Sequence, residues 1–173
     1  MRAMGWWTVA LSVATTLAVG GSVGVLRAET REEEAARYLK ELKSNDPKKK
    51  ALAAEGIGEI GRIKASLARP AVPLLLEALT DKSAEVRAKA ATAIGRVDPE
   101  NKLDVAKKLA AMVTNEKEEM KVKQGALAGL SALGSEARPV AKDLADYAKK
   151  IEGNDKKFAT AIRNTLKNIG GKK

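Results

Sequence analysis

The chain has 173 residues, a net charge of +10 and neither histidine nor cysteine. It therefore has no histidine general base, no thiolate nucleophile and none of the usual ligands of zinc, copper, haem or iron–sulfur clusters. Apolar residues make up 45% and aromatic residues only 3%, a composition that suits stacked helices more than a compact sheet domain. We expect a protein that is not an enzyme and that carries no cofactor and no metal.

The first 28 residues differ in kind from the rest. An uncharged apolar run extends from Gly5 to Leu26. Such a run is typical of an export signal, and it is also long enough to remain as a single membrane span. Residues 1–28 are thus expected to be a signal peptide, cleaved after Ala28 or further upstream, or an anchor formed by residues 5–26. In both cases the remaining chain would be exported.

A helical pair is predicted directly after this leader. Thr30 and Glu33 have the spacing of a capping box, in which each side chain bonds to the backbone N–H of the other residue, and they predict the start of a helix over residues 32–43. Asp46 and Pro47 then have the residue types of an N-cap and a first helical position. The second helix of the pair is expected to begin there.

The second helix contains Gly56-x-Gly58-x-x-Gly61, which matches the glycine fingerprint of dinucleotide-binding folds. In those folds a strand precedes the glycines and a helix begins within them, so that helical N–H groups face a pyrophosphate. Here a helix precedes the glycines, so no nucleotide is expected to bind. We interpret Gly56 and Gly58 as sites of close helix packing and Gly61 as the residue that ends the helix.

The same pattern recurs down the chain about every 36 residues. Four aligned segments share a column of large apolar residues, which are Ile57, Ile94, Leu130 and Leu166. Each segment follows an earlier helix, and these are predicted over residues 32–43, 69–79, 100–113 and 137–150. The turns between the helices of each pair are predicted to supply the N-caps of the second helices, which are Asp46, Asp81, Asn115 and Asn154. Asp98, which precedes Pro99, is interpreted as the N-cap of the helix that follows it.

Tandem helical pairs of this length, with prolines in the first helix and a second helix that opens Val86-Arg87-x-Lys89-Ala90-Ala91-x-x-Ile94-Gly95, resemble HEAT repeats. The resemblance covers roughly residues 31–170, leaves 171–173 as a basic tail, and is clearest over 69–98. It implies an all-α, right-handed α-solenoid of about four helical pairs, or eight helices, whose second helices line a concave surface. The first repeat lacks the prolines, as expected of an end repeat that faces water on one side.

A basic residue opens three of the second helices, namely Lys50, Arg87 and Lys123. This column would suit anion binding. In HEAT-like repeats, however, the position usually pairs with acids of the turns such as Asp81, and we favour that structural role. In the fourth repeat Ala159 stands at this position, so no such pairing is expected there.

The repeat register places a set of polar residues on the presumed concave surface, where we expect a partner to bind: Lys89, Thr92, Arg96, Glu55, Glu59, Asn164 and Asn168. Because this set has no single sign of charge, we favour a protein or peptide as the partner. One alternative is a binder of nucleic acid, anionic lipid or envelope polymer without sequence preference, which a net charge of +10 would favour. Another is an enzyme related to HEAT-like bilin lyases or DNA glycosylases, which would need clustered aromatic residues and a catalytic carboxylate.

Overall fold

The computed structural model describes residues 29–170, so the predicted leader at 1–28 and the predicted tail at 171–173 lie outside it. The described chain contains helices and no strand. The α-helices and two 3₁₀ segments follow in the order α1 (Arg31–Glu41), α2 (Pro47–Ile63), α3 (Ala65–Ala68), η1 (Arg69–Ala71), α4 (Val72–Ala78), α5 (Ala84–Arg96), α6 (Lys102–Thr114), α7 (Met120–Leu133), η2 (Gly134–Val140), α8 (Ala141–Ile151) and α9 (Lys156–Gly170).

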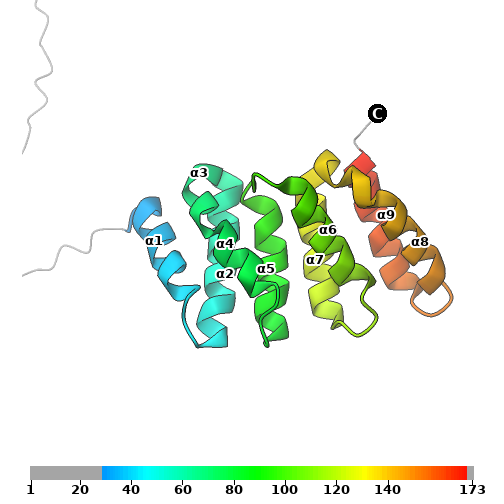
Figure 1. Cartoon of the computed structure of the whole chain (residues 1–173), viewed down its shortest axis with the longest axis horizontal. Coiled ribbons are helices and arrows are strands. Elements are labelled where there is room, and N and C mark those ends of the chain that lie inside the picture. The colour runs from blue at the N-terminus through cyan, green and yellow to red at the C-terminus, as the bar shows by residue number, and fades with distance from the viewer. Residues whose placement is uncertain (1–28, 171–173) are drawn as a thin grey trace, which may run out of the picture.

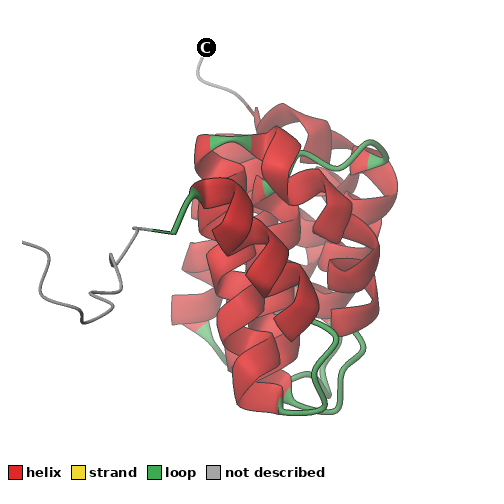
Figure 2. Cartoon of the chain, turned by 90° about the vertical axis from the view of Figure 1, so that its left-hand side faces the viewer, coloured by secondary structure: helices red, strands yellow, loops and turns green. Residues whose placement is uncertain are grey.

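These elements form four helical pairs stacked along one axis (Figure 1). In the second pair, α3, η1 and α4 together take the place of a single first helix, and in the fourth pair η2 leads into α8. The second helices α2, α5, α7 and α9 lie side by side, and each is covered by first-helix elements (Figures 1 and 2). The predicted all-α solenoid of four pairs is confirmed, while its right-handed sense stays an implication of the resemblance. Among residues 29–170, no helix combines the length and apolar character needed to cross a membrane.

The predicted apolar columns form the core of the stack. Ile57, Ile94 and Leu130 are fully buried, and Leu166 of the last repeat is partly buried. Burying a side chain of this size contributes roughly 1.5–3 kcal/mol relative to leaving it in water. Each repeat therefore depends on its neighbours for the surface that covers its own apolar residues.

The predicted helix starts at Thr30 and Asp46 are confirmed. Thr30 and Glu33 form a capping box at α1, and the Asp46 carboxylate accepts a hydrogen bond from the Lys48 N–H, with Pro47 as the first residue of α2. In the other turns, the residue predicted as the N-cap is not the one directly before the second helix. Ser83 precedes α5 and Asp155 precedes α9, rather than the predicted Asp81 and Asn154.

Asn115, Gly61 and Asp98 do not have the predicted roles. Asn115 ends α6, and its side-chain oxygen accepts from the Lys117 N–H inside the turn. Gly61 lies inside α2, buried where a Cβ atom would stand 2.9 Å from the Val97 side chain, so it permits packing and does not end the helix. Asp98 has a φ of 53° and pairs with cations, while Asn101 caps α6 by accepting from the Asp104 N–H.

Three further glycines let the second helices approach each other at backbone distance. A Cβ atom on Gly95 would collide with the backbone of Gly129, one on Gly129 with the carbonyl oxygen of Ala91, and one on Gly125 with that of Ala88. Gly56, by contrast, faces the ring of Tyr38 on α1. Close packing is therefore the role of these glycines, although the partner of Gly56 belongs to a first helix.

Candidate binding groove

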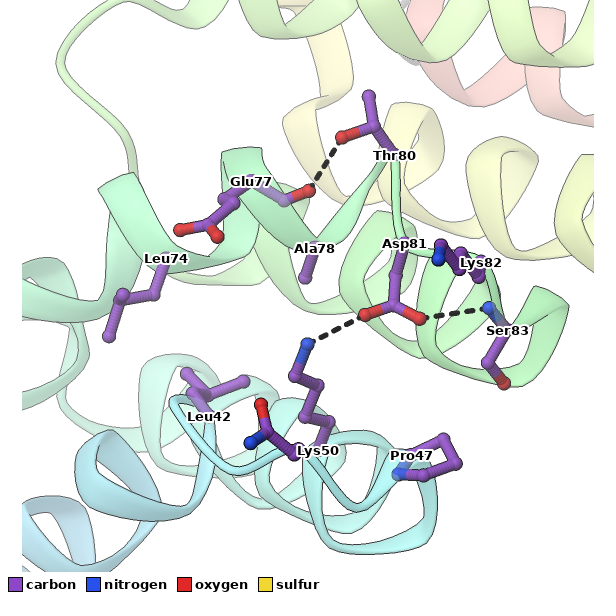
Figure 3. A pocket seen from close by; sticks show the side chains of 11 residues that line it. Leu42, Pro47, Lys50, Leu74, Glu77, Ala78, Thr80, Asp81, Lys82 and Ser83 are labelled. Atoms are coloured by element: carbon purple, nitrogen blue, oxygen red, sulfur yellow. Dashed lines mark hydrogen bonds and ion pairs between the residues drawn. The ribbon is translucent and has the colours of Figure 1, made fainter.

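Ion pairs between consecutive repeats position the second helices. The Lys50 ammonium lies 2.8 Å from a carboxylate oxygen of Asp81, whose other oxygen accepts from the Ser83 N–H (Figure 3). Arg87 repeats this link one repeat later, with its guanidinium 2.7 Å from Glu118. These two contacts show the structural role predicted for the basic column.

Lys123, the third member of the column, has a different partner. It is buried, and its ammonium lies 3.4 Å from the hydroxyl of Tyr147 and 5.9 Å from the centre of the tyrosine ring. An aromatic residue of the next repeat thus replaces the acid that Lys50 and Arg87 contact. The link from one repeat to the next is kept.

The residues predicted to bind a partner are exposed or half-buried on the second helices α2, α5 and α9, and we call them the second-helix face: Glu55, Glu59, Lys89, Thr92, Arg96, Asn164 and Asn168. On this face, α2 supplies acids and α5 supplies cations. The Lys89 ammonium lies 2.7 Å from Glu55, and the Arg96 guanidinium pairs with Glu59. A hydrogen bond from Arg62, together with the charge of Arg96, holds the pKa of Glu59 below its ordinary value.

Five of the seven predicted residues line one hollow of about 150 Å³, together with Gly58 and Ala93. Thr92 lies in its floor, where its hydroxyl donates to the carbonyl oxygens of Ala88 and Gly125. The two asparagines of α9 do not reach this hollow. Asn168 donates to the hydroxyl of Ser131 at 3.0 Å, and the exposed Asn164 side chain makes no hydrogen bond within residues 29–170.

A second hollow of about 370 Å³ continues the second-helix face toward α7. Its lining contains the cations Arg62, Arg96 and Lys102, together with the small residues Gly95 and Ala132. Asp98 is the acid in its lining, and hydrogen bonds from Lys102 and Arg69 hold the pKa of that carboxyl below its ordinary value.

Sequence reasoning missed this second hollow and the pairing of acids with cations across α2 and α5. The signal was present in the register, because Arg96 stands one repeat after Glu59, and Lys89 stands about one helical turn before the position one repeat after Glu55. Side chains at these offsets meet only when the second helices are adjacent and nearly parallel. Glu55 and Glu59 were therefore recognised as surface residues without their partners.

The family model described as HEAT repeats matches residues 35–131 and 72–152, most of the described chain. The chain belongs to the HEAT repeat family. HEAT repeats commonly form helical scaffolds that mediate protein interactions, and the family is typically non-catalytic. No curated protein matches the chain in sequence.

Proposed function

We propose that this HEAT-repeat protein is an exported, non-catalytic scaffold that binds a protein or peptide on its second-helix face. The observation that carries the proposal is the balanced charge of the hollow between α2 and α5. Glu55 and Glu59 face Lys89 and Arg96 there, so the hollow offers both signs of charge within a few ångströms. A peptide brings charges of both signs and polar backbone groups, whereas a polyanion would meet two carboxylates.

The ion pairs of the hollow can exchange partners at low cost. The four side chains retain between 31% and 49% of their exposed surface. Ion pairs this exposed contribute about 0–1 kcal/mol to stability. An incoming carboxylate or ammonium group can therefore replace one member of a pair without destabilising the solenoid.

The remainder of the second-helix face supplies room and amide groups. Ala128 and Ala132 of α7 are exposed and short, so they leave space above the backbone. Asn164 of α9 is exposed, and its amide can both donate to and accept from a peptide backbone. A bound peptide would run across the second helices from the charged hollow to Asn164.

The groove is tested by crosslinking and affinity capture of the exported protein from its own cells. We expect the amount of partner recovered to be at least about fivefold lower with the double variant Lys89→Ala and Arg96→Ala than with the native chain, since arginine is a frequent interface anchor. The matched control is Lys107→Ala with Lys108→Ala, which removes the same charge from exposed positions on α6. Circular dichroism should show unchanged helicity in both variants. Loss of the partner with the α6 variant alone would place the interaction on the first helices instead.

Export is a separate part of the proposal and rests on the uncharged apolar run from Gly5 to Leu26. A reporter enzyme that is active only outside the cytoplasm, fused after Lys173, should be active. A second fusion that lacks residues 1–28 is the control and should be inactive. Activity of a reporter that functions only in the cytoplasm, at the same fusion point, would contradict export.

A further inference from the structure

The turns inside the four helical pairs all lie along one edge of the solenoid (Figures 1 and 2). We call this the turn edge and define it by the four turns with the helix ends beside them, residues 42–49, 79–85, 115–121 and 152–157. Lysines and acids alternate along the sequence of these segments. In the structure, the acids have partners within the protein and most of the lysines do not.

Every acid of the turn edge forms an ion pair or a hydrogen bond with another residue of the protein. Four bind a basic residue of the same or a neighbouring repeat: Asp81 binds Lys50, Glu116 binds Lys150, Glu118 binds Arg87 and Glu152 binds Arg163. Asp46 and Asp155 accept backbone hydrogen bonds at the starts of α2 and α9. Glu85 and Glu119 share Lys121 at 3.8 and 3.9 Å.

The lysines of the same edge are mostly left without such partners. Seven are exposed and their ammonium groups form no ion pair or hydrogen bond with residues 29–170: Lys43, Lys48, Lys49, Lys82, Lys117, Lys156 and Lys157. Each of the four turns contributes at least one of them. These lysines form a row of unpaired positive charge along the edge, with one to three of them in each turn.

The opposite edge, formed by the connections between pairs, has a mixed arrangement of charges. Lys64 pairs with Glu32, and both Arg69 and Lys102 pair with Asp98. Its acids Glu100 and Glu136 form no ion pair with the described residues. The opposite edge thus has free charges of both signs, because Arg31 and Lys142 are exposed there and form no ion pair with residues 29–170, whereas the turn edge leaves only lysines without a partner.

We propose that the turn edge binds a linear phosphate-bearing polymer through these lysines, without reading its sequence. Neighbouring helices pack 8–10 Å apart, so four turns form a row on the order of 30 Å long. Lysine ammonium groups bind phosphate as point charges and adapt to its position through a flexible stem. The described aromatic residues Tyr38, Tyr147 and Phe158 are partly or fully buried, which leaves no platform for stacking bases.

A soluble polymer fits the position of this edge better than a membrane does. Helix α1 ends at the first turn of the turn edge, so its first residue, Arg31, lies toward the opposite edge (Figure 1). The apolar leader joins the described chain at that end. A membrane anchor at residues 5–26 would therefore join the described chain on the side away from the turn edge.

The test uses the full chain in a neutral detergent and fluorescently labelled duplex DNA as the probe. For duplex DNA, the slope of log affinity against log salt gives the number of phosphates that the protein neutralises. The turn-edge variant carries Lys48→Gln, Lys82→Gln, Lys117→Gln and Lys157→Gln, one change for each repeat. The control variant carries Lys40→Gln, Lys107→Gln, Lys108→Gln and Lys142→Gln, which remove four equally exposed and unpaired lysines from first helices. Fluorescence anisotropy over a salt series gives the affinity and its salt slope.

We expect the turn-edge variant to bind DNA at least about tenfold more weakly, with a slope of log affinity against log salt reduced by about 3 to 4. The control variant, and the Lys89→Ala with Arg96→Ala variant of the second-helix face, should bind like the native chain. This site is therefore separable from the proposed function, whose test can fail independently. Equal losses in the turn-edge and control variants would overturn the proposal. So would a loss on phosphatidylglycerol vesicles confined to the turn-edge variant, with DNA binding unchanged.

Discussion

Gly129 occupies a position where the fold admits no side chain. A Cβ atom there would collide with the carbonyl oxygen of Ala91 on α5 and would lie 2.9 Å from Leu109 of α6. The first obstacle is backbone, which cannot rotate away as a side chain can. The contact between α5 and α7 therefore depends on the absence of a single methyl group.

We predict that Gly129→Ala lowers the free energy of unfolding by about 1–3 kcal/mol, because the inserted methyl group forces the two backbones apart. The loss should appear even though alanine in a helix interior is favoured over glycine by about 1 kcal/mol. Urea denaturation followed by circular dichroism measures it. Gly153→Ala is the control, since a Cβ atom there meets nothing within 4 Å, and its effect should stay within about 0.5 kcal/mol. Equal stability of the two variants would mean that the backbones separate without cost.

At the residue scale, the sequence predicted which positions must be small but not always what they face. Gly56 was interpreted as a site of close helix packing, and it does pack closely, but against Tyr38 of a first helix, whereas Gly129 packs against α5. Asp98 shows the opposite difficulty. Its neighbour Pro99 suggested a helix start, whereas in the structure it has a positive φ and pairs with Lys102 and with Arg69, which lies 29 residues earlier in the chain. No local pattern contains that information.

The second helices are linked one to the next by partly buried ion pairs. The side chains of Arg87 and Glu118 are 18% and 12% exposed, and those of Lys50 and Asp81 are 26% and 15% exposed. Burial opposes ionisation of Asp81 and Glu118, but the hydrogen bonds from Lys50 and Arg87, the backbone hydrogen bonds and the nearby positive charges together outweigh it, so the pKa of each carboxyl is lower than in the unfolded chain. These links are thus strongest with both acids ionised.

Lowered pKa values make the stability of the solenoid depend on pH in a defined direction. Above about pH 4–5, where unfolded Asp and Glu are ionised, the two links stabilise the fold fully. As pH falls through the lower pKa values of the folded state, the acids are protonated and that contribution is lost. We predict that Asp81→Asn and Glu118→Gln, measured by thermal melting, destabilise the protein at pH 7 by about 2 kcal/mol each and much less at pH 3. An equal loss at both pH values would show that the carboxylate charge is not what links the repeats.

At the element scale, hydrophobic periodicity predicted every helical pair and its order, because the burial of one face determines where a helix forms. The ends were less predictable. Polar turn residues such as Asp81 and Asn115 satisfy backbone groups inside the turn as readily as at a helix start, and both do so here. In the second pair, the first helix is broken into α3, η1 and α4 around Pro70 and Pro73, which cannot donate backbone hydrogen bonds.

For the whole molecule, the sequence register was enough to bring Glu55, Glu59, Lys89, Thr92 and Arg96 to one hollow. It was not enough to reveal the turn edge. Read along the sequence, its lysines and acids alternate and suggest a surface of mixed charge. Only the stacked structure shows that the acids contact basic residues of the same or adjacent repeats, so the electrostatic character of the edge is a property of assembly.

The backbone contacts at Gly95, Gly125 and Gly129 also determine where the stack of repeats can bend. Touching backbones cannot be compressed further, and α2, α5 and α7 already pack at small residues along their contacts. Between α7 and α9, Thr165 stands one repeat after Gly129 and brings a side chain to this contact. The hydrogen bond from Asn168 to Ser131 joins these two helices, while the contacts of Lys123 with Tyr147 and of Glu116 with Lys150 link α7 and its turn to α8. Bending under load should therefore concentrate between α7 and α9. The first three repeats would move as one rigid body, and the fourth would rotate against them about a hinge between α7 and α9.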